Sequence, residues 1–242
     1  MSVAVKTENL TKKYKDKTAV DGINLTINEG ELFALLGVNG AGKTTTIRML
    51  SCLSTPTDGK AYVFEKDVVK ESASVKSIVG ISPQDTAVAE KLTVEENLKF
   101  MASIYSKGDE RVEEIIRMFK LLEVRNKKAK TLSGGWKRKL SIAMAIIGEP
   151  KILYLDEPTL GLDVLARREL WKEIEILKKN MTIILTTHYM EEAEALSDRI
   201  AVMIDGKIAA IGTLDELEKM TGKKGLEEVF VSIAGEGGND CE

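Results

Sequence analysis

The stretch that decides the fold is LFALLGVNGAGKTTTIRML, which runs from Leu32 to Leu50. Five apolar residues, Leu32–Leu36, are typical of a strand buried on both faces, as in a parallel sheet covered by helices. The run Gly37–Thr44 then fits the pattern G-x-x-x-x-G-K-[ST], and residues 45–53, TTIRMLSCL, form a plausible helix. Such a loop turns several backbone N–H groups toward an anion, and the helix N-terminus adds partial positive charge. The stretch therefore predicts a phosphate-binding loop in an α/β fold.

A second apolar run, Ile152–Leu155, ends in two carboxylates, Asp156 and Glu157. Ligands of open α/β sheets bind at the carboxyl edge of the strands, so both acids are expected near the loop. We expect Lys43 to reach the outer phosphates and the Thr44 hydroxyl to hold magnesium. Asp156 can order the magnesium shell, and Glu157 can act as general base toward a water beside the terminal phosphate. The alternative is that the two acids only cap a helix, although the proline and glycine that follow favour a loop.

Hydrophobic patterns outline the other strands. The first thirty residues alternate apolar and polar in short runs, VAVKTENL and INLTINEG, which predicts antiparallel strands. A third unbroken apolar run, Ile183–Leu185, predicts another buried strand of the parallel sheet. Near the C-terminus, RIAVMIDGKIAAIG places two apolar runs around Asp205-Gly206, which predicts a hairpin.

The segment between the first two buried strands has a helical pattern. Thr93 and Glu96 have capping-box spacing and open a helix with apolar residues on one side. A second helix is expected from Asp109 to Leu122. Residues 86–148 are therefore predicted to form a helical lobe inserted into the α/β core. After Gly212 we expect two short helices and then a disordered, glycine-rich acidic tail from residue 235.

Composition limits the possible functions. The chain has 242 residues, of which 43% are apolar and 30% charged, and its net charge of -3 argues against general binding of nucleic acids. Cys52 and Cys241 lie far apart and offer no disulfide framework, which fits a reducing compartment. No signal-like segment and no run of about 20 apolar residues is present, so we expect no membrane span in this chain.

The stretch LSGGWKRKLSIAMA, residues 132–145, predicts a helix that packs inward through an apolar stripe. Ser133, Gly134 and Gly135 precede this stripe and leave room for a close approach to the helix N-terminus. A helix N-terminus with small residues can bind an anion. The alternative is that the two glycines merely start a helix after a loop.

Together these motifs resemble those of the ATP-binding subunit of an ABC transporter. GVNGAGKT resembles the Walker A loop and ILYLDE the Walker B strand, ISPQD the Q-loop, LSGGW the signature LSGGQ, GLD the D-loop, and LTTH the switch region. The order and spacing match over nearly all of residues 1–215. Three positions depart from the usual pattern: Trp136 replaces a glutamine, Val38 replaces a common proline, and Leu160 fills a position that is often small and polar. Trp136 would lie at the dimer seam and alter either dimer affinity or ribose contacts.

The resemblance implies ATP and Mg²⁺ as cofactors and assigns roles by position. The catalytic residues would be Lys43, Gln84, Glu157 and His188, and the metal would be held by Thr44, Gln84 and Asp156. The residues expected to contact nucleotide are Tyr14, Gly37, Val38, Asn39, Gly40, Ala41, Gly42, Lys43, Thr44, Thr45, Ser133, Gly134, Gly135 and Asp163. Tyr14 lies where the family places an aromatic ring that stacks on adenine, although it could be an ordinary surface tyrosine. The signature residues would contact the ATP of a second copy, so that two chains pack head to tail around two ATPs.

The expected fold class is α/β, with a P-loop core around a mixed, largely parallel sheet, an antiparallel β subdomain and the inserted helical lobe. Residues 1–215 would form this ATPase domain, and residues 216–242 a short helical extension with the tail. The expected partners are a second copy of the chain, or a homologous ATPase subunit, and an integral membrane permease that holds the protein at the cytoplasmic face of the membrane.

The function that the resemblance implies is ATP hydrolysis that powers transport. Residues 187–217 resemble those of subunits that export drugs, polysaccharides, lipids or ions, which favours export. One alternative is an ATP-gated soluble assembly factor, from which co-purification with a membrane protein would distinguish the transporter. A module that closes on ATP without hydrolysing it is disfavoured by Glu157 and His188.

Overall fold

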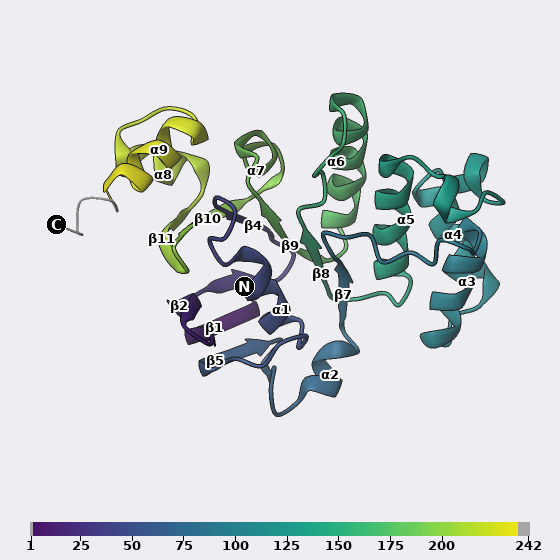
Figure 1. The fold of residues 1–242 in the computed structure, drawn as a ribbon, viewed down its shortest axis with the longest axis horizontal. Coiled ribbons are helices and arrows are strands. Elements are labelled where there is room, and N and C mark those ends of the chain that lie inside the picture. Colours follow the sequence, from purple (N-terminus) through teal and green to yellow (C-terminus); the bar gives the residue numbers. More distant parts are fainter. Residues whose placement is uncertain (1, 237–242) are drawn as a thin grey trace.

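A six-stranded sheet forms the centre of the computed structural model, which describes residues 2–236 (Figure 1). Its strand order is β11-β10-β4-β9-β8-β7, with all neighbours parallel except the β10–β11 hairpin. The strands are β4 Leu32–Leu36, β7 Val79–Ser82, β8 Ile152–Asp156, β9 Thr182–Thr187, β10 Arg199–Ile204 and β11 Lys207–Gly212. The expected buried strands and the hairpin are confirmed. Because β4, β9 and β8 are adjacent and parallel, the residues that follow them meet at one edge of the sheet.

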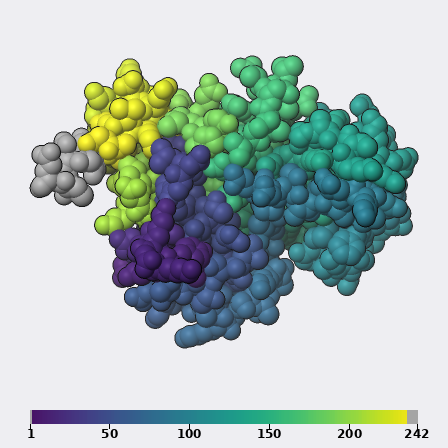
Figure 2. Space-filling model, in the orientation of Figure 1, coloured from purple at the N-terminus to yellow at the C-terminus, as the bar shows by residue number. Residues whose placement is uncertain are grey.

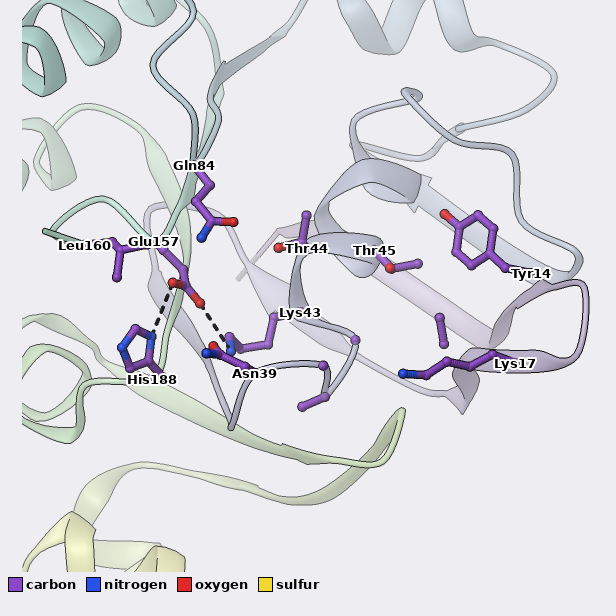
Figure 3. A pocket seen from close by; sticks show the side chains of 14 residues that line it. Tyr14, Lys17, Asn39, Lys43, Thr44, Thr45, Gln84, Glu157, Leu160 and His188 are labelled. Carbon is purple, nitrogen blue, oxygen red and sulfur yellow. Dashed lines mark ion pairs between the residues drawn. The ribbon is translucent and has the colours of Figure 1, made fainter.

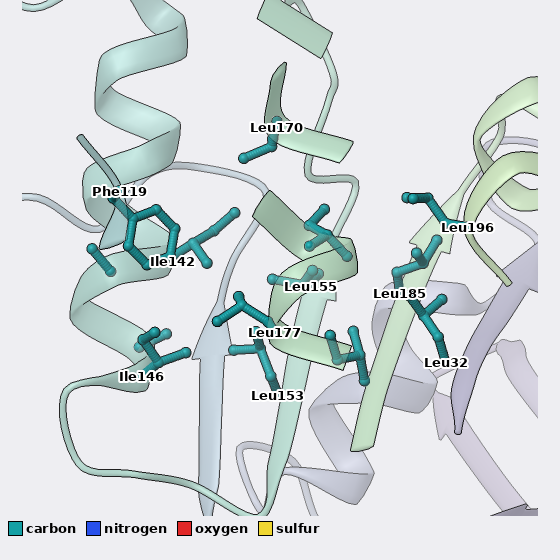
Figure 4. Close-up of a cluster of buried hydrophobic side chains, with 14 of the residues drawn as sticks. Leu32, Phe119, Ile142, Ile146, Leu153, Leu155, Leu170, Leu177, Leu185 and Leu196 are labelled. Carbon is teal, nitrogen blue, oxygen red and sulfur yellow. The ribbon is translucent and has the colours of Figure 1, made fainter. Parts of the chain in front are cut away.

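Both faces of this sheet are covered, which explains the unbroken apolar runs. In β4, Leu32 and Leu36 belong to the hydrophobic cluster under the helices, whereas Phe33 and Leu35 belong to the cluster on the opposite face. All of these side chains are fully buried. Figure 4 shows the helix-side cluster, which brings together Leu32 of β4, Leu153 and Leu155 of β8, and Leu185 of β9. A strand buried on both faces cannot show the alternating pattern of a half-exposed strand.

The N-terminal strands form the expected antiparallel sheet, in the order β2-β1-β5-β6, with β3 also paired to β1. These strands are β1 Val3–Tyr14, β2 Lys17–Ile23, β3 Thr26–Asn28, β5 Asp58–Val63 and β6 Lys66–Asp67. Helix α1, Lys43–Leu50, contacts strands of both sheets, and its apolar residues join the cluster between them. A short helix, α2, spans Ser72–Lys76. The phosphate-loop helix is thus enclosed by the two sheets.

Three helices lie between β7 and β8 in the chain, in the segment expected to form the inserted lobe. They are α3 Val94–Ile104, α4 Asp109–Met118 and α5 Gly134–Ile146, with 3-10 turns at Leu121–Val124 and Ala129–Thr131. Thr93 and Glu96 form the expected capping box at the start of α3. These helices occupy one end of the molecule in Figures 1 and 2, and the last helices of the chain occupy the other.

Two predicted helix ends were wrong. Helix α4 ends at Met118 rather than at Leu122, because Lys120 adopts a left-handed φ of 54° and a 3-10 turn follows. Phe119, directly after the helix, is buried with 1% exposure. Helix α1 includes Lys43 and ends at Leu50, because the next residues form a turn in which Cys52 has a φ of 59°.

The described part of the chain contains four more helices: α6 Val164–Lys178, α7 Met190–Leu196, α8 Leu214–Thr221 and α9 Leu226–Glu236. The two short helices expected after Gly212 are confirmed as α8 and α9. The predicted acidic tail falls largely on residues 237–242, which lie outside the described residues. The limits of the predicted regions, 1–215 and 216–242, remain predictions.

Candidate active site

The loop of residues 37–42 connects β4 to α1 and folds around the side chain of Lys43, the first residue of that helix. The Lys43 ammonium donates hydrogen bonds to the carbonyl oxygens of Gly37, at 2.7 Å, and Val38, at 3.1 Å. Gly42 has a φ of 104°, and a Cβ there would lie 2.4 Å from the carbonyl oxygen of Ala19. The glycine is therefore required both by the backbone conformation and by the close approach of β2.

The two carboxylates at the end of β8 have different environments. Asp156 accepts hydrogen bonds at the same Oδ1 from the hydroxyls of Thr44, at 3.0 Å, and Thr186, at 2.6 Å. The backbone N–H of Glu157 donates to the Thr186 hydroxyl at 3.0 Å. Glu157 has a φ of 46°, a left-handed conformation that is strained for a residue with a side chain and that is often found at functional sites. Thr186, at the end of β9, thus fixes both acids, a role that the sequence motifs did not indicate.

Glu157 lies between a lysine and the histidine of the chain, as Figure 3 shows. Its Oε1 is 3.4 Å from the Lys43 ammonium, and its Oε2 is 3.2 Å from His188 Nδ1. The histidine contact is within ion-pair distance, but Nδ1 makes no hydrogen bond with good geometry. Burial lowers the pKa of Lys43, and the charge of Glu157 opposes this shift. The buried carboxylate and ammonium therefore compensate each other's charge.

These groups line a cavity of about 460 Å³. In Figure 3 the Tyr14 ring and Lys17 lie at one end, Glu157 and His188 lie at the other, and Gln84 points toward the space between Glu157 and Thr44. The lining residues are Tyr14, Lys17, Ala19, Asn39, Gly40, Ala41, Gly42, Lys43, Thr44, Thr45, Gln84, Glu157, Leu160 and His188. Most of the residues expected to contact nucleotide thus line one cavity. Asp156 does not line it, but it accepts a hydrogen bond from Thr44, which does.

The cavity also contains residues that sequence reasoning missed. Lys17 and Ala19 belong to β2, and Lys17 pairs with Tyr14 across the β1–β2 turn. The motif KKYKDKTAVDG could have indicated Lys17, because a tight antiparallel turn places its ends side by side. Leu160 was noted only as a departure from the usual pattern, yet it lines the cavity.

The signature and D-loop residues do not line this cavity. Ser133 is the N-cap of α5 and accepts a hydrogen bond from the backbone N–H of Trp136. Asp163 is the N-cap of α6 and accepts hydrogen bonds from two N–H groups in that helix, both at 2.9 Å. A Cβ at Gly135 would lie 3.4 Å from the Cβ of Ala166, so the signature turn packs against the start of α6. The two motifs therefore form one surface, separate from the cavity of their own chain.

The oxygen groups beside the loop fit a magnesium ion. Thr44 and Asp156 place a hydroxyl and a carboxylate oxygen 3.0 Å apart, and Mg²⁺ prefers such hard oxygen ligands. Within residues 2–236, no group of three or more His, Cys, Asp or Glu side chains is gathered as a metal site. A magnesium ion would therefore depend on the phosphate oxygens of a nucleotide to complete its ligands, as is usual for phosphate-bound Mg²⁺.

Comparisons with known proteins agree with this site. The family model described as "ABC transporter" matches residues 20–160. The daunorubicin/doxorubicin resistance ATP-binding protein DrrA of Streptomyces peucetius is 41% identical, over 92% of this chain and 69% of that protein. The human phospholipid-transporting ATPase ABCA3 is 40% identical over 86% of this chain, but the chain spans only 13% of that protein. It spans 26% of ABC transporter A family member 9 of Dictyostelium discoideum and 25% of ABC transporter A family member 5 of Arabidopsis thaliana.

Solved structures give the same result. The ATP-binding subunit of an ABC transporter superposes with a TM-score of 0.86 and 28% identity, covering 96% of this chain and 99% of that one. A dimeric, post-hydrolysis structure of the ATP-binding cassette MJ0796 bound to ADP and Pi has a TM-score of 0.79 and 28% identity, covering 87% and 98%. The chain therefore belongs to the ABC transporter family, and it matches solved ATP-binding subunits of that family over nearly its whole length. No helix within residues 2–236 is both long enough and apolar enough to cross a membrane.

Proposed function

We propose that this cassette dimerises head to tail around two ATPs and that hydrolysis powers export through a separate integral membrane subunit. The observation that carries the proposal is the position of the signature turn. Ser133 and Gly134 are exposed at the N-terminus of α5 and lie outside the cavity of their own chain. An open helix N-terminus with small residues suits an anion. The terminal phosphate of an ATP held by a second copy is the anion that the dimer would place there.

The D-loop supports this arrangement. Because Asp163 caps α6 beside the signature turn, the same surface of one chain can present both motifs to its partner. The similar cassette bound to ADP and Pi is described as a dimer. Two such surfaces, each facing the cavity of the other chain, would close both sites together.

The residues around the cavity suit attack by water on the terminal phosphorus. Glu157 would accept a proton from the water while the water oxygen bonds to the terminal phosphorus. The bond from that phosphorus to the bridging oxygen breaks, and ADP leaves with that oxygen. The Lys43 ammonium, now shared with Glu157, would turn to the phosphate oxygens and stabilise their charge. His188 lies beside Glu157 and would hold the water in line.

Magnesium would be held by Thr44 and Asp156, with Gln84 approaching from the cavity wall. When bound, the ion supplies charge compensation for the phosphates. Thr186 keeps the Asp156 carboxylate in place through its hydroxyl, so that the oxygen facing Thr44 is oriented before any ion binds. Thr44 and Asp156 would then set the position of the ion relative to Lys43.

The names of relatives support the transport part of the proposal. DrrA is described as a resistance ATP-binding protein, and a relative from Escherichia coli, 38% identical, as a probable multidrug ABC transporter ATP-binding protein. Resistance to a drug fits its removal from the cell, which favours export for this chain. Coupling to a permease would place the cassette at the cytoplasmic face of the membrane, with its cargo chosen by the membrane subunit.

The Glu157→Gln variant tests the proposal. The amide keeps the shape of the side chain but cannot take the proton, so ATP should bind without being hydrolysed. The trapped ATP should hold a dimer in gel filtration with ATP and magnesium, whereas ADP should give monomers. A variant that stays monomeric with ATP would contradict the head-to-tail dimer, and one that hydrolyses ATP at the normal rate would show that Glu157 is not the base.

A further inference from the structure

Arg138 is a buried cation at the junction of two motifs. It lies one turn after the start of α5 and is only 5% exposed. Its Nη1 donates to the carbonyl oxygen of Pro83 at 2.7 Å, and its Nη2 donates to that of Gln84 at 2.6 Å. One guanidinium thus holds two successive backbone carbonyls of the segment that follows β7. Hydrogen bonds from a planar, charged fork are strong and fix the geometry of both partners.

Burial of this charge is unfavourable unless it is compensated. Desolvation lowers the pKa of Arg138, and the nearby carboxylates of Asp156, Asp85 and Glu192 oppose that shift. Asp156 belongs to the active site described above. These carboxylates act on the guanidinium through their charge, and its direct hydrogen-bond partners are the two carbonyls, which join α5 to the segment after β7.

The hydrogen bonds of Arg138 link a residue that lines the cavity of its own chain to the helix that would meet the ATP of a second copy. Gln84 lines the cavity of its own chain, whereas Gly134, at the N-terminus of α5, faces outward. Arg138 lies four residues beyond Gly134, which is about 6 Å along a helix. A second link lies one turn further on, where the hydroxyls of Ser82 and Ser141 are 2.9 Å apart. A shift of the Gln84 backbone must therefore move α5, or break these contacts.

From this geometry we infer that Arg138 is a positioning residue, which transmits the position of Gln84 to the signature turn. Occupation of the cavity in one chain would in this way set how the same chain's α5 meets the ATP of a second copy. The inference rests on the proposed head-to-tail dimer, and it assigns to Arg138 a role beyond support of the fold.

The chain offers a matched control at the other end of the same helix. Arg111 Nη2 donates to the carbonyl oxygen of Ile146 at 2.9 Å, and its Nε donates to that of Ile147 at 3.3 Å. This arginine also holds two successive carbonyls of the α5 region, but it lies away from the cavity. Removal of either guanidinium should lower the melting temperature. Only the loss of Arg138 should affect communication between the sites.

The experiment compares R138M, R138K and R111M, each in the Glu157→Gln background. Two quantities are measured: the Kd of Mg-ATP for the monomer at low protein concentration, and the dimer dissociation constant with saturating ATP. R138M should weaken the dimer at least tenfold while monomer binding of ATP changes less than threefold. R111M should leave both constants within threefold, and R138K, which keeps a charged donor, should recover part of the dimer affinity.

Three results would overturn the inference: equal dimer constants for R138M and R111M, parallel loss of ATP binding and dimerisation in R138M, or no recovery in R138K. If R138M does not fold, R138Q takes its place with the same expected and contradicting results. A Glu157→Gln parent that fails to dimerise overturns the proposed function, and the inference with it. If the Glu157→Gln parent dimerises and R138M dimerises with the same dissociation constant, only the inference about Arg138 is overturned, and the proposed function stands.

Discussion

The substitution Gly135→Asp should disrupt the proposed dimer while leaving the fold of the monomer intact. In the monomer, a Cβ at Gly135 meets only the Cβ of Ala166, at 3.4 Å, which is an ordinary contact, and the backbone is not left-handed. Replacement of a helical glycine and an acid in the first turn of a helix each stabilise by up to about 1 kcal/mol. We therefore expect a folded monomer whose melting temperature changes by no more than a few degrees.

In the proposed dimer the same carboxylate would face the terminal phosphate across the seam. Two unit charges about 4 Å apart repel by about 4 kcal/mol at an effective dielectric constant of 20. The dimer would contain two such contacts, together about 8 kcal/mol. Since about 1.4 kcal/mol corresponds to a tenfold change, Gly135→Asp should weaken ATP-dependent dimerisation more than about a hundred-thousandfold and abolish hydrolysis. Gly135→Asn has nearly the same shape without the charge, so it should weaken ATP-dependent dimerisation much less than Gly135→Asp.

Sedimentation velocity with ATP, in the Glu157→Gln background, measures the dimer, and a fluorescent ATP analogue measures binding to the monomer. The expected result is near-normal monomer binding together with a lost dimer for Gly135→Asp and a weakened dimer for Gly135→Asn. The reasoning would be refuted if Gly135→Asp dimerised like its parent. It would also be refuted if the monomer lost nucleotide, because the signature would then act within its own chain.

Three further predictions follow from single contacts. Lys43→Ala should nearly abolish nucleotide binding, measured by calorimetry, because it removes the ammonium held at the loop; normal turnover would contradict this role. Tyr14→Ala should raise the Kd for ATP by about 5- to 150-fold, the equivalent of 1–3 kcal/mol of base stacking, whereas Tyr14→Phe should bind normally; equal affinities for both variants would show that the ring does not stack. Hydrogen bonds from Arg125 lower the pKa of Glu95 from 4.5 to about 2, so its stabilising contribution is present above pH 4.5 and is lost as the pH falls toward 2. Glu95→Gln should flatten the acid dependence of the urea midpoint over that range, and an unchanged profile would show that this pair does not contribute.

Much of the core was predictable because local pattern and fold agree there. Leu32–Leu36 is unbroken and apolar because the strand is buried on both faces, and Gly40 and Gly42 of the loop are needed at positive φ. The prediction from hydrophobic periodicity was wrong where a single backbone angle ends a helix. Leu121 and Leu122 continue the apolar pattern of α4, but the left-handed Lys120 ends the helix before them.

Long-range polar contacts were not predictable. Arg138 lies in the run WKRK, which looks like a solvated surface, and its carbonyl partners are 54 and 55 residues away in sequence. The same is true of Thr186, whose hydroxyl orders Asp156 from the neighbouring strand. A sequence shows which side chains can form hydrogen bonds, but only the packed structure shows which of them must do so to satisfy buried partners.

The central claim is that the cavity of one chain is completed by the signature turn of another. Its most direct test is disulfide cross-linking between two different variants, Asn39→Cys and Ser133→Cys, both with Glu157→Gln and with Cys52 and Cys241 replaced by serine. We predict that mild oxidation with ATP and magnesium gives a covalent dimer when the two variants are mixed, and little when either is oxidised alone or when ADP replaces ATP. If the mixture binds ATP but forms no ATP-dependent covalent dimer, the two motifs do not meet across chains and the account is wrong.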